Sequence, residues 1–156
     1  MDAFTTCLWF DTQAGDAADF YCDLFPDGEI TGRQLYGDAG PRPAGSVMTV
    51  DFTINGQRFV GLNGGPQFNF DEAISFQIPC ADQDEVDRYW DRLTDGGEES
   101  QCGWCKDRFG VSWQVIPAAL PELLSDPDPA RAQRAMTAML GMKKLDVAAL
   151  RAAADG

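Results

Sequence analysis

The chain carries an internal repeat, and this repeat limits the possible folds more than any other feature of the sequence. A shift of 69 residues superimposes the apolar positions of two predicted helices. In each half, a strand precedes the helix and three strands follow it. Because the period is longer than that of a solenoid, two copies predict a pseudo-symmetric pair of modules. The shift places Ala17, Phe20, Tyr21 and Leu24 on Val86, Tyr89, Trp90 and Leu93.

Apolar periodicity and turn residues predict the elements of the first module. Pro26 ends its helix, because proline cannot continue a helix interior. Asn55-Gly56 stands between two alternating runs, which is the strongest short-range signal of a β-hairpin. The predicted elements are a strand over 4–10, a helix over 13–25, a strand over 29–36, and strands over 46–54 and 57–63.

The second module follows a linker over 64–71 and repeats the same order. Asp82 with Glu85 three residues later predicts the N-terminus of its helix. The predicted elements are a strand over 73–80, a helix over 83–94, short strands near 98–102 and 104–106, and a strand over 111–117.

The C-terminal tail has a different pattern. Asp128 and Pro129 predict a helix that runs to about residue 140, and Asp146 predicts the start of a last short helix. Such a tail buries little apolar surface alone, so we expect it to pack on the body of the protein or on a second subunit. The chain is predicted to comprise a two-module domain over 1–117, with modules at about 1–63 and 72–117, and a helical tail over 118–156.

Charge and composition exclude several classes of partner. The net charge is −13, which argues against nucleic acid and anionic membranes as partners. No apolar run approaches the roughly 20 residues of a membrane helix. The first residues lack the basic start of a signal peptide, and the five cysteines are an odd number without dense spacing. We therefore expect reduced thiols and a cytoplasmic location.

Several phrases of the sequence resemble one superfamily. FYCDLFPDGEI after the first helix and KDRFGVSWQVIP at the end of the second module are similar to the vicinal oxygen chelate superfamily, which includes glyoxalases, extradiol dioxygenases and bleomycin-resistance proteins. LWFD, GQRFVGLNGGPQFNF, AISFQIPC and CGWCKDRFGVSWQ resemble its PhnB-like branch, some of whose members are labelled demethylubiquinone methyltransferase. The resemblance covers essentially the whole chain. It implies an α+β fold in which two βαβββ modules pair into a curved mixed sheet around a cavity, with C-terminal helices.

The resemblance also implies where a divalent metal would be bound. Superfamily ligands are His, Glu or Gln on the first and last strands of each module, and the corresponding positions here are Thr5, Gly61, Ala73 and Gln114. The chain has no histidine, and three of these four positions lack an ordinary ligand side chain. We therefore expect no metal and no cofactor.

Strand alternation predicts the side chains that face the cavity. In the first strand Leu8 and Phe10 are assigned to the core, and in the fourth Val60 and Leu62 are, which leaves the opposite positions for the cavity. Aromatic groups mixed with neutral polar groups suit a small, partly apolar organic ligand. The predicted ligand-binding residues are Thr5, Cys7, Trp9, Asp51, Phe59, Asn63, Ser75, Gln77, Ser112 and Gln114.

Three candidate sites leave alternatives open. Asp51 is either a general base with a raised pKa or a carboxylate on a solvated sheet face. Cys7 is either a nucleophile, although no histidine can activate it, or a small buried thiol. Cys102 and Cys105 form a CxxC pair that lacks the helix N-terminus of redox motifs, so a cross-strand disulfide or chance zinc binding is the other reading.

Two functions of different classes follow. The first is a metal-free protein that binds a small organic molecule in the cavity between the modules. The second is an enzyme acting on a small metabolite through Asp51, Cys7 or Gln114, as a lyase, isomerase or transferase. Methyl transfer is a poor special case, because no glycine-rich loop followed by an acidic residue marks a site for S-adenosylmethionine. Open strand edges and the amphipathic tail also predict a homodimer.

Overall fold

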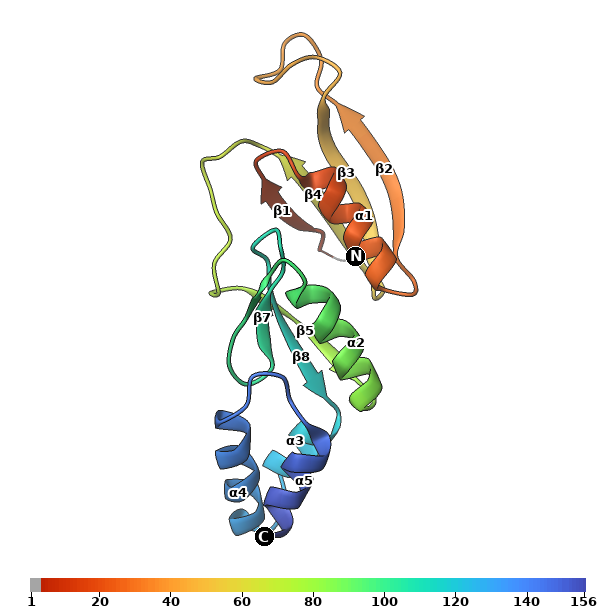
Figure 1. The fold of residues 1–156 in the computed structure, drawn as a ribbon. Coiled ribbons are helices and arrows are strands. Elements are labelled where there is room, and N and C mark those ends of the chain that lie inside the picture. The colour runs from red at the N-terminus through yellow and green to blue at the C-terminus, as the bar shows by residue number, and fades with distance from the viewer. Residues whose placement is uncertain (1–3) are drawn as a thin grey trace. The chain divides into compact units, whose positions relative to one another are not determined.

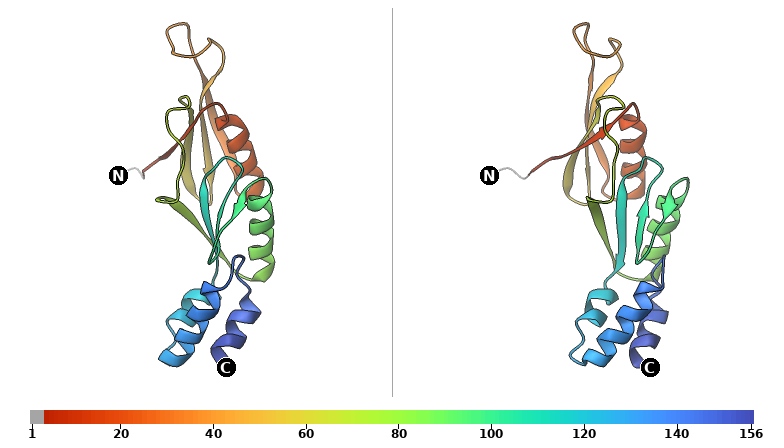
Figure 2. Two further views of the ribbon diagram at one scale, coloured as in Figure 1. Left: turned by 60° about the vertical axis from the view of Figure 1, so that its left-hand side comes forward. Right: turned by 90° about the vertical axis from the view of Figure 1, so that its left-hand side faces the viewer.

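A computed structural model describes residues 4–156 of the chain. Within these residues the chain divides into two compact units, with the boundary between Asn69 and Phe70 (Figure 1). Each unit contains a four-stranded mixed sheet with one helix along it, as the two views of Figure 2 show. The α+β class predicted from the sequence is confirmed.

The first unit follows the predicted order of elements. Its strands are arranged β1-β4-β3-β2, with β1 parallel to β4 and the other pairs antiparallel. The elements are β1 (Thr6–Phe10), α1 (Ala14–Leu24), β2 (Glu29–Leu35), β3 (Val47–Ile54) and β4 (Gln57–Asn63).

The second unit repeats this topology and adds the tail. Its sheet order is β5-β8-β7-β6, again with one parallel pair, between β5 and β8. Identical order and strand sense in the two sheets confirm the repeat. The elements are β5 (Ser75–Cys80), α2 (Gln83–Thr94), β6 (Glu98–Glu99), β7 (Trp104–Lys106), β8 (Ser112–Pro117), α3 (Ala119–Leu124), α4 (Pro129–Leu140) and α5 (Val147–Asp155).

The matching apolar stripes of α1 and α2 are buried against the two sheets. Tyr21 is fully buried in the first unit, and Trp90 holds the equivalent place in the second. Phe20 differs from the prediction because it is only half-buried, and Ala18 beside it takes a fully buried place instead. The aromatic core of the first unit is completed by Phe52, whose ring stacks on Phe59 with centroids 5.3 Å apart.

The hairpin turn between β3 and β4 is held by a side chain from elsewhere in the unit. Asn55 and Gly56 both have positive φ, as a two-residue hairpin turn requires. The carboxylate of Asp27 accepts hydrogen bonds from both of their backbone N–H groups, each 2.9 Å long. These bonds, that from Asn55 foremost, lower the pKa of Asp27.

This turn gives a pH-dependent prediction for Asp27→Asn. Because the pKa of Asp27 is lowered on folding, its contribution to stability is present above the ordinary carboxyl pKa of 3.8 and is lost as the pH falls through the lowered value. We expect the variant to be less stable than wild type by roughly 0.5 kcal/mol at pH 6, since the group is exposed. Urea unfolding at about pH 6 and pH 3 checks this, and an equal difference at both values would contradict it.

The tail belongs to the second unit. Leu120, Leu145 and Leu150 form a buried cluster among α3, α5 and the segment between α4 and α5. Ile116 at the end of β8 packs on this cluster, and the side-chain amide of Gln83 at the start of α2 bonds to the backbone of Leu145 and Val147. Of these helices, α3 is not predicted by the sequence pattern. The tail thus packs on the body of its own chain.

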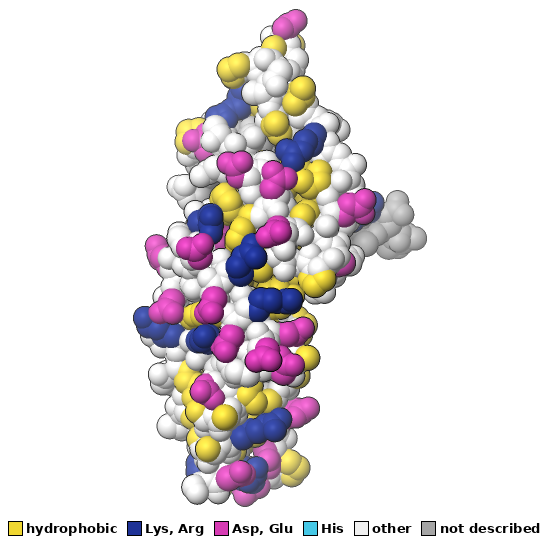
Figure 3. Space-filling view, turned by 45° about the vertical axis from the view of Figure 1, so that its right-hand side comes forward, with side chains coloured by type: hydrophobic (Ala, Val, Ile, Leu, Met, Phe, Trp, Pro, Cys, Tyr) yellow, Lys and Arg dark blue, Asp and Glu magenta, His cyan; other side chains and the backbone are white. Residues whose placement is uncertain are grey.

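Acidic and basic side chains are mixed on the surface. On the face seen in Figure 3, Lys and Arg side chains lie among Asp and Glu side chains. Lys144, for example, lies 3.0 Å from Asp87 and 3.5 Å from Asp91. No helix within residues 4–156 has the length and apolar character needed to cross a bilayer.

Candidate functional site

A row of neutral polar side chains crosses the edge strand β5 and the neighbouring strand β8 of the second sheet. Gln77 Nε2 donates to Gln114 Oε1 over 3.1 Å, and Gln114 Nε2 donates to Ser75 Oγ over 2.8 Å. Because Gln77 pairs with Gln114 in the parallel β5–β8 register, their side chains share the sheet face opposite the buried Ile78 and Val115. We call this surface, comprising Ser75, Gln77, Trp104 and Gln114, the polar face.

The hydrogen bonds fix the orientation of the Gln114 amide but leave capacity for a ligand. Gln114 uses one N–H and one lone pair of its oxygen, and an amide has a second of each. Gln77 is exposed, whereas Ser75 and Gln114 are half-buried. The row therefore presents donors and acceptors to a molecule that carries hydroxyl or carbonyl groups.

Trp104 and Lys106 join this side of the sheet through β7. Trp104 pairs with Gln114 and Lys106 pairs with Ser112 in the antiparallel register, so each shares the face of its partner. The sequence reasoning missed both residues, because β7 has three residues and shows little alternation. Pairing β7 with β8 would have revealed them.

A small hollow adjoins Ser112 and Trp104. Its volume is about 110 Å³, and its walls include Lys106 and Glu72. These two side chains form an ion pair of 2.5 Å, which lowers the pKa of Glu72 and raises the pKa of Lys106. Ser112 itself is buried, and its hydroxyl donates to the backbone carbonyl of Asp71 over 3.5 Å.

Cys7 and Asp51 lie on the corresponding face of the first sheet. Cys7 on β1 and Asp51 on β3 both pair with Val60 of the intervening β4. Two strand spacings, about 9–10 Å, therefore separate their backbones, so Asp51 is not placed to activate the thiol. Cys7 is exposed, so the interpretation of it as a small buried thiol is wrong, and desolvation still raises the pKa of Cys7, which favours the unreactive thiol.

Trp9 shares this face and is held by the segment after β4. Its Nε1 donates to the carbonyl of Gly65 over 2.8 Å, and its ring meets the edge of Phe68 at a centroid distance of 5.1 Å. A Cβ on Gly64 would overlap the indole ring, so glycine is required for this approach. Thr5 is exposed and lies one residue before β1.

The sequence reasoning assigned Phe59 and Asn63 to the wrong face of β4. Phe59 pairs with Phe52 and both are buried on the side of α1, whereas Val60 and Leu62 take the opposite face. Two facts explain the error: β4 has apolar residues on both faces, and alternation alone does not choose between them.

Asn63 has a structural place on the α1 side. Its Oδ1 accepts a hydrogen bond from Ala14 N over 2.8 Å, and its Nδ2 donates to Val47 O over 3.1 Å. Asn63, the last residue of β4, thereby joins the start of α1 to the start of β3. Its side chain is 6% exposed.

The four positions implied for a metal do not fit one. Gly61 faces α1, where a Cβ would lie 3.1 Å from that of Ala14, and Ala73 lies in an exposed turn. Thr5 is exposed, and the amide of Gln114 is bonded to its neighbours. Among the described residues, no group of three or more His, Cys, Asp or Glu is arranged to hold a metal ion. No step of the function proposed below runs through a metal.

The CxxC pair occupies the loop before and the start of β7. Cys102 is half-buried and has a φ of 58°, and its backbone N–H donates to Met142 O of the tail. Cys105 is buried, and burial raises the pKa of its thiol to about 12. A thiol of this kind stays protonated at neutral pH, unlike the reactive thiolate of a redox motif.

Comparisons with known proteins agree with this fold. A family model described as 3-demethylubiquinone-9 3-methyltransferase matches residues 2–116. The solved PhnB protein from Bacillus cereus is 32% identical with a TM-score of 0.69, and the match covers 75% of this chain and 100% of that one.

Two further solved structures share the fold. Protein PA1353 from Pseudomonas aeruginosa is 20% identical with a TM-score of 0.61, over 75% of this chain and 98% of that one. The fosfomycin resistance protein FosX from Listeria monocytogenes is 19% identical with a TM-score of 0.54, over 80% of this chain and 97% of that one. A comparison with curated proteins found no match.

Proposed function

This chain belongs to the 3-demethylubiquinone-9 3-methyltransferase family, a PhnB-like group with the glyoxalase fold, and from this premise we propose that it binds a small, uncharged organic molecule on the polar face. The observation that carries the proposal is the hydrogen-bonded row of Gln77, Gln114 and Ser75. Oriented amides of this kind recognise hydroxyl and carbonyl groups.

The ligand class follows from the chemistry of this surface. The three side chains of the row are neutral, so a charged group would gain no ion pair from them. Trp104 beside Gln114 supplies an aromatic surface. The family is named after demethylubiquinone, whose head group is an oxygenated ring. We therefore favour a ring that carries neighbouring oxygen substituents.

Methyl transfer is not part of the proposal. The two strand-to-helix turns, residues 11–13 and 81–82, contain no glycine. Glycine-rich turns are what let a backbone approach a nucleotide closely. The side chains therefore support a binding role. Three expectations from the sequence stay predictions: a cavity between the modules, a homodimer and a cytoplasmic location.

Gln114→Leu tests the proposal, because leucine keeps the approximate size of the side chain and removes its hydrogen bonds. We expect catechol to bind wild type and to bind the variant about tenfold more weakly, the equivalent of roughly one hydrogen bond. Titration by ¹H–¹⁵N NMR follows the glutamine side-chain amide signals directly.

The controls separate binding on the polar face from general effects. Gln133→Leu alters an exposed glutamine on α4 and should bind catechol like wild type. Toluene, a ring without hydroxyl groups, should bind wild type more weakly than catechol does. The proposal would be abandoned if catechol failed to bind wild type at millimolar concentration, or bound Gln114→Leu equally well.

A further inference from the structure

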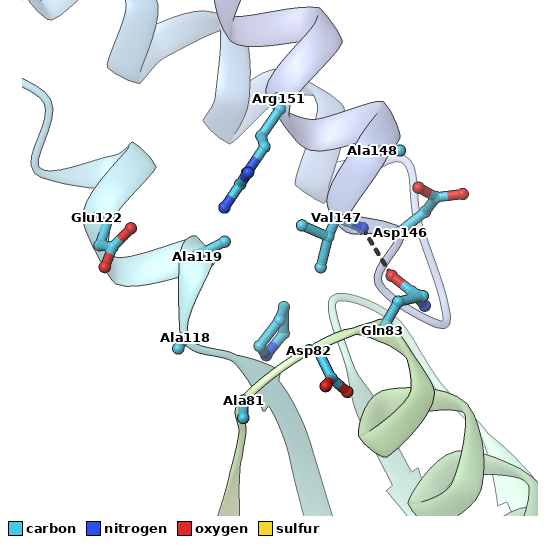
Figure 4. A pocket seen from close by; sticks show the side chains of 11 residues that line it. Ala81, Asp82, Gln83, Ala118, Ala119, Glu122, Asp146, Val147, Ala148 and Arg151 are labelled. Carbon is cyan, nitrogen blue, oxygen red and sulfur yellow. Dashed lines mark hydrogen bonds between the residues drawn. The ribbon is translucent and has the colours of Figure 1, made fainter.

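The tail builds a cavity that lies mostly outside the part of the chain matched by the family model. The match ends at residue 116, and eight of the eleven residues that line the cavity come from residues 117–151. Its walls are the start of α2, the start of α3 and the first turns of α5 (Figure 4). It shares no lining residue with the polar face, so it raises a separate question of binding.

Small side chains leave this space unfilled. Ala81, Ala118, Ala119, Ala148 and Pro117 contribute little bulk to the walls. The cavity has a volume of about 690 Å³, which is within the usual range of roughly 300–1,000 Å³ for small-molecule sites.

The position of α5 on this cavity is fixed by hydrogen bonds to the body of the unit. Gln83 Oε1 accepts a hydrogen bond of 2.8 Å from Val147 N, drawn in Figure 4, and Gln83 Nε2 donates to Leu145 O. Leu145 and Leu150 are completely buried beneath. The walls are therefore part of the folded unit and not a loosely attached segment.

Two opposite charges on the cavity walls have no partner among the described residues. Figure 4 shows Arg151 extending from α5 into the space that Glu122 of α3 borders on the other side. Within residues 4–156, neither side chain makes a hydrogen bond or an ion pair, and their charged atoms are farther apart than an ion pair allows. Arg33, Arg42 and Arg108, in contrast, are each paired with an aspartate.

Two further carboxylates line the cavity on the side of α2 and α5, away from Glu122 (Figure 4). Asp82 and Asp146 each accept one backbone N–H bond as helix caps, from Glu85 and Ala149 respectively. A carboxylate has capacity for further hydrogen bonds. The walls thus offer one guanidinium, which binds carboxylates in a forked geometry, and several carboxylates, which bind ammonium groups.

We propose that this cavity is a second binding site, for a small zwitterion that carries a carboxylate and an ammonium group, such as an amino acid. The carboxylate binds Arg151, the ammonium group binds Glu122, and the carbon chain lies along the small apolar side chains. A single anion would meet the three carboxylates, and a single cation would leave Arg151 unpaired.

Calorimetric titration with 6-aminohexanoate tests this site, with hexanoate and hexylamine as probes of equal length and a single charge. We expect wild type to bind the zwitterion at least tenfold more tightly than either control. Because both contacts are ionic and partly exposed, raising the salt from about 0.02 M to 0.2 M should weaken binding.

Variants assign the binding to the cavity. Arg151→Gln and Glu122→Gln, both on the surface, should each weaken the binding of 6-aminohexanoate at least tenfold. Arg108→Gln removes a charge elsewhere in the unit and should leave this binding unchanged. Absence of binding to wild type at millimolar concentration, equal binding of hexanoate or hexylamine, or unchanged binding by Arg151→Gln would each overturn the proposal.

Discussion

Asp107→Ala is expected to lower the free energy of unfolding by about 4 kcal/mol, because it leaves two buried donors and one part-buried donor without an acceptor. Asp107 is 3% exposed and lies in the turn between β7 and β8. Its Oδ1 accepts the backbone N–H groups of Phe109 and Val111 over 2.9 and 3.1 Å, and its Oδ2 accepts Trp113 Nε1 over 2.8 Å.

The loss at Asp107 is large because the surrounding donors cannot turn to solvent. Trp113 is buried on the α2 side of the sheet and Val111 is buried beside it. An unsatisfied buried donor costs about 1–3 kcal/mol, so even partial entry of water leaves a substantial deficit.

Urea unfolding monitored by tryptophan fluorescence measures this effect. Asp38→Ala, which alters an exposed aspartate in a loop, is the control and should change stability by less than about 0.5 kcal/mol. Asp107→Asn should also be destabilised, because an amide offers one acceptor oxygen to donors on two sides. A loss below about 1 kcal/mol for Asp107→Ala would show that these bonds are not what holds the turn.

Asn63→Ala is the second change with a large expected effect, a loss of about 3 kcal/mol. Removing the amide leaves Ala14 N at the start of α1 and Val47 O on β3 without their partner. The site is buried and adjoins Tyr36, whose hydroxyl donates to Asn63 O over 2.7 Å. Both helix attachment and strand pairing are therefore weakened together.

Comparison with a second asparagine makes this test specific. Asn69 is exposed near the end of the first unit, and Asn69→Ala should unfold at nearly the wild-type urea concentration. Asn63→Asp should fall between wild type and Asn63→Ala, since it keeps the acceptor for Ala14 N and loses the donor to Val47 O. A loss of stability in Asn63→Ala no larger than that in Asn69→Ala would contradict the prediction.

The order of elements could be predicted because the signals for it are local. Asp82 accepts Glu85 N at the start of α2, and Asn55-Gly56 adopts the positive φ values of a hairpin turn. The observed helix Gln83–Thr94 has the predicted bounds, since a cap and an apolar stripe together define both of its ends. The repeat placed the same succession of elements in both modules.

Three of the four residues of the polar face could be predicted in the same way. On β5 and β8 the polar residues Gln77 and Gln114 alternate with buried Ile78 and Val115, so periodicity identifies the face. On β4 it does not, because Phe59, Val60 and Leu62 make both faces apolar. The pairing of Phe59 with Phe52 decides the question, and that contact is not local.

The sequence alone thus determined the repeat, the order of strands and helices within the two modules, the shared face of Ser75, Gln77 and Gln114, and the lack of a metal-ligand set. The tertiary structure alone decided the face of β4, the structural role of Asn63 and the cavity in which Arg151 and Glu122 face the same space. The difference arises from the distance along the chain over which each feature is specified. Period, caps and turns act over a few residues, whereas a cavity depends on which distant side chains the packing of helices leaves without a partner.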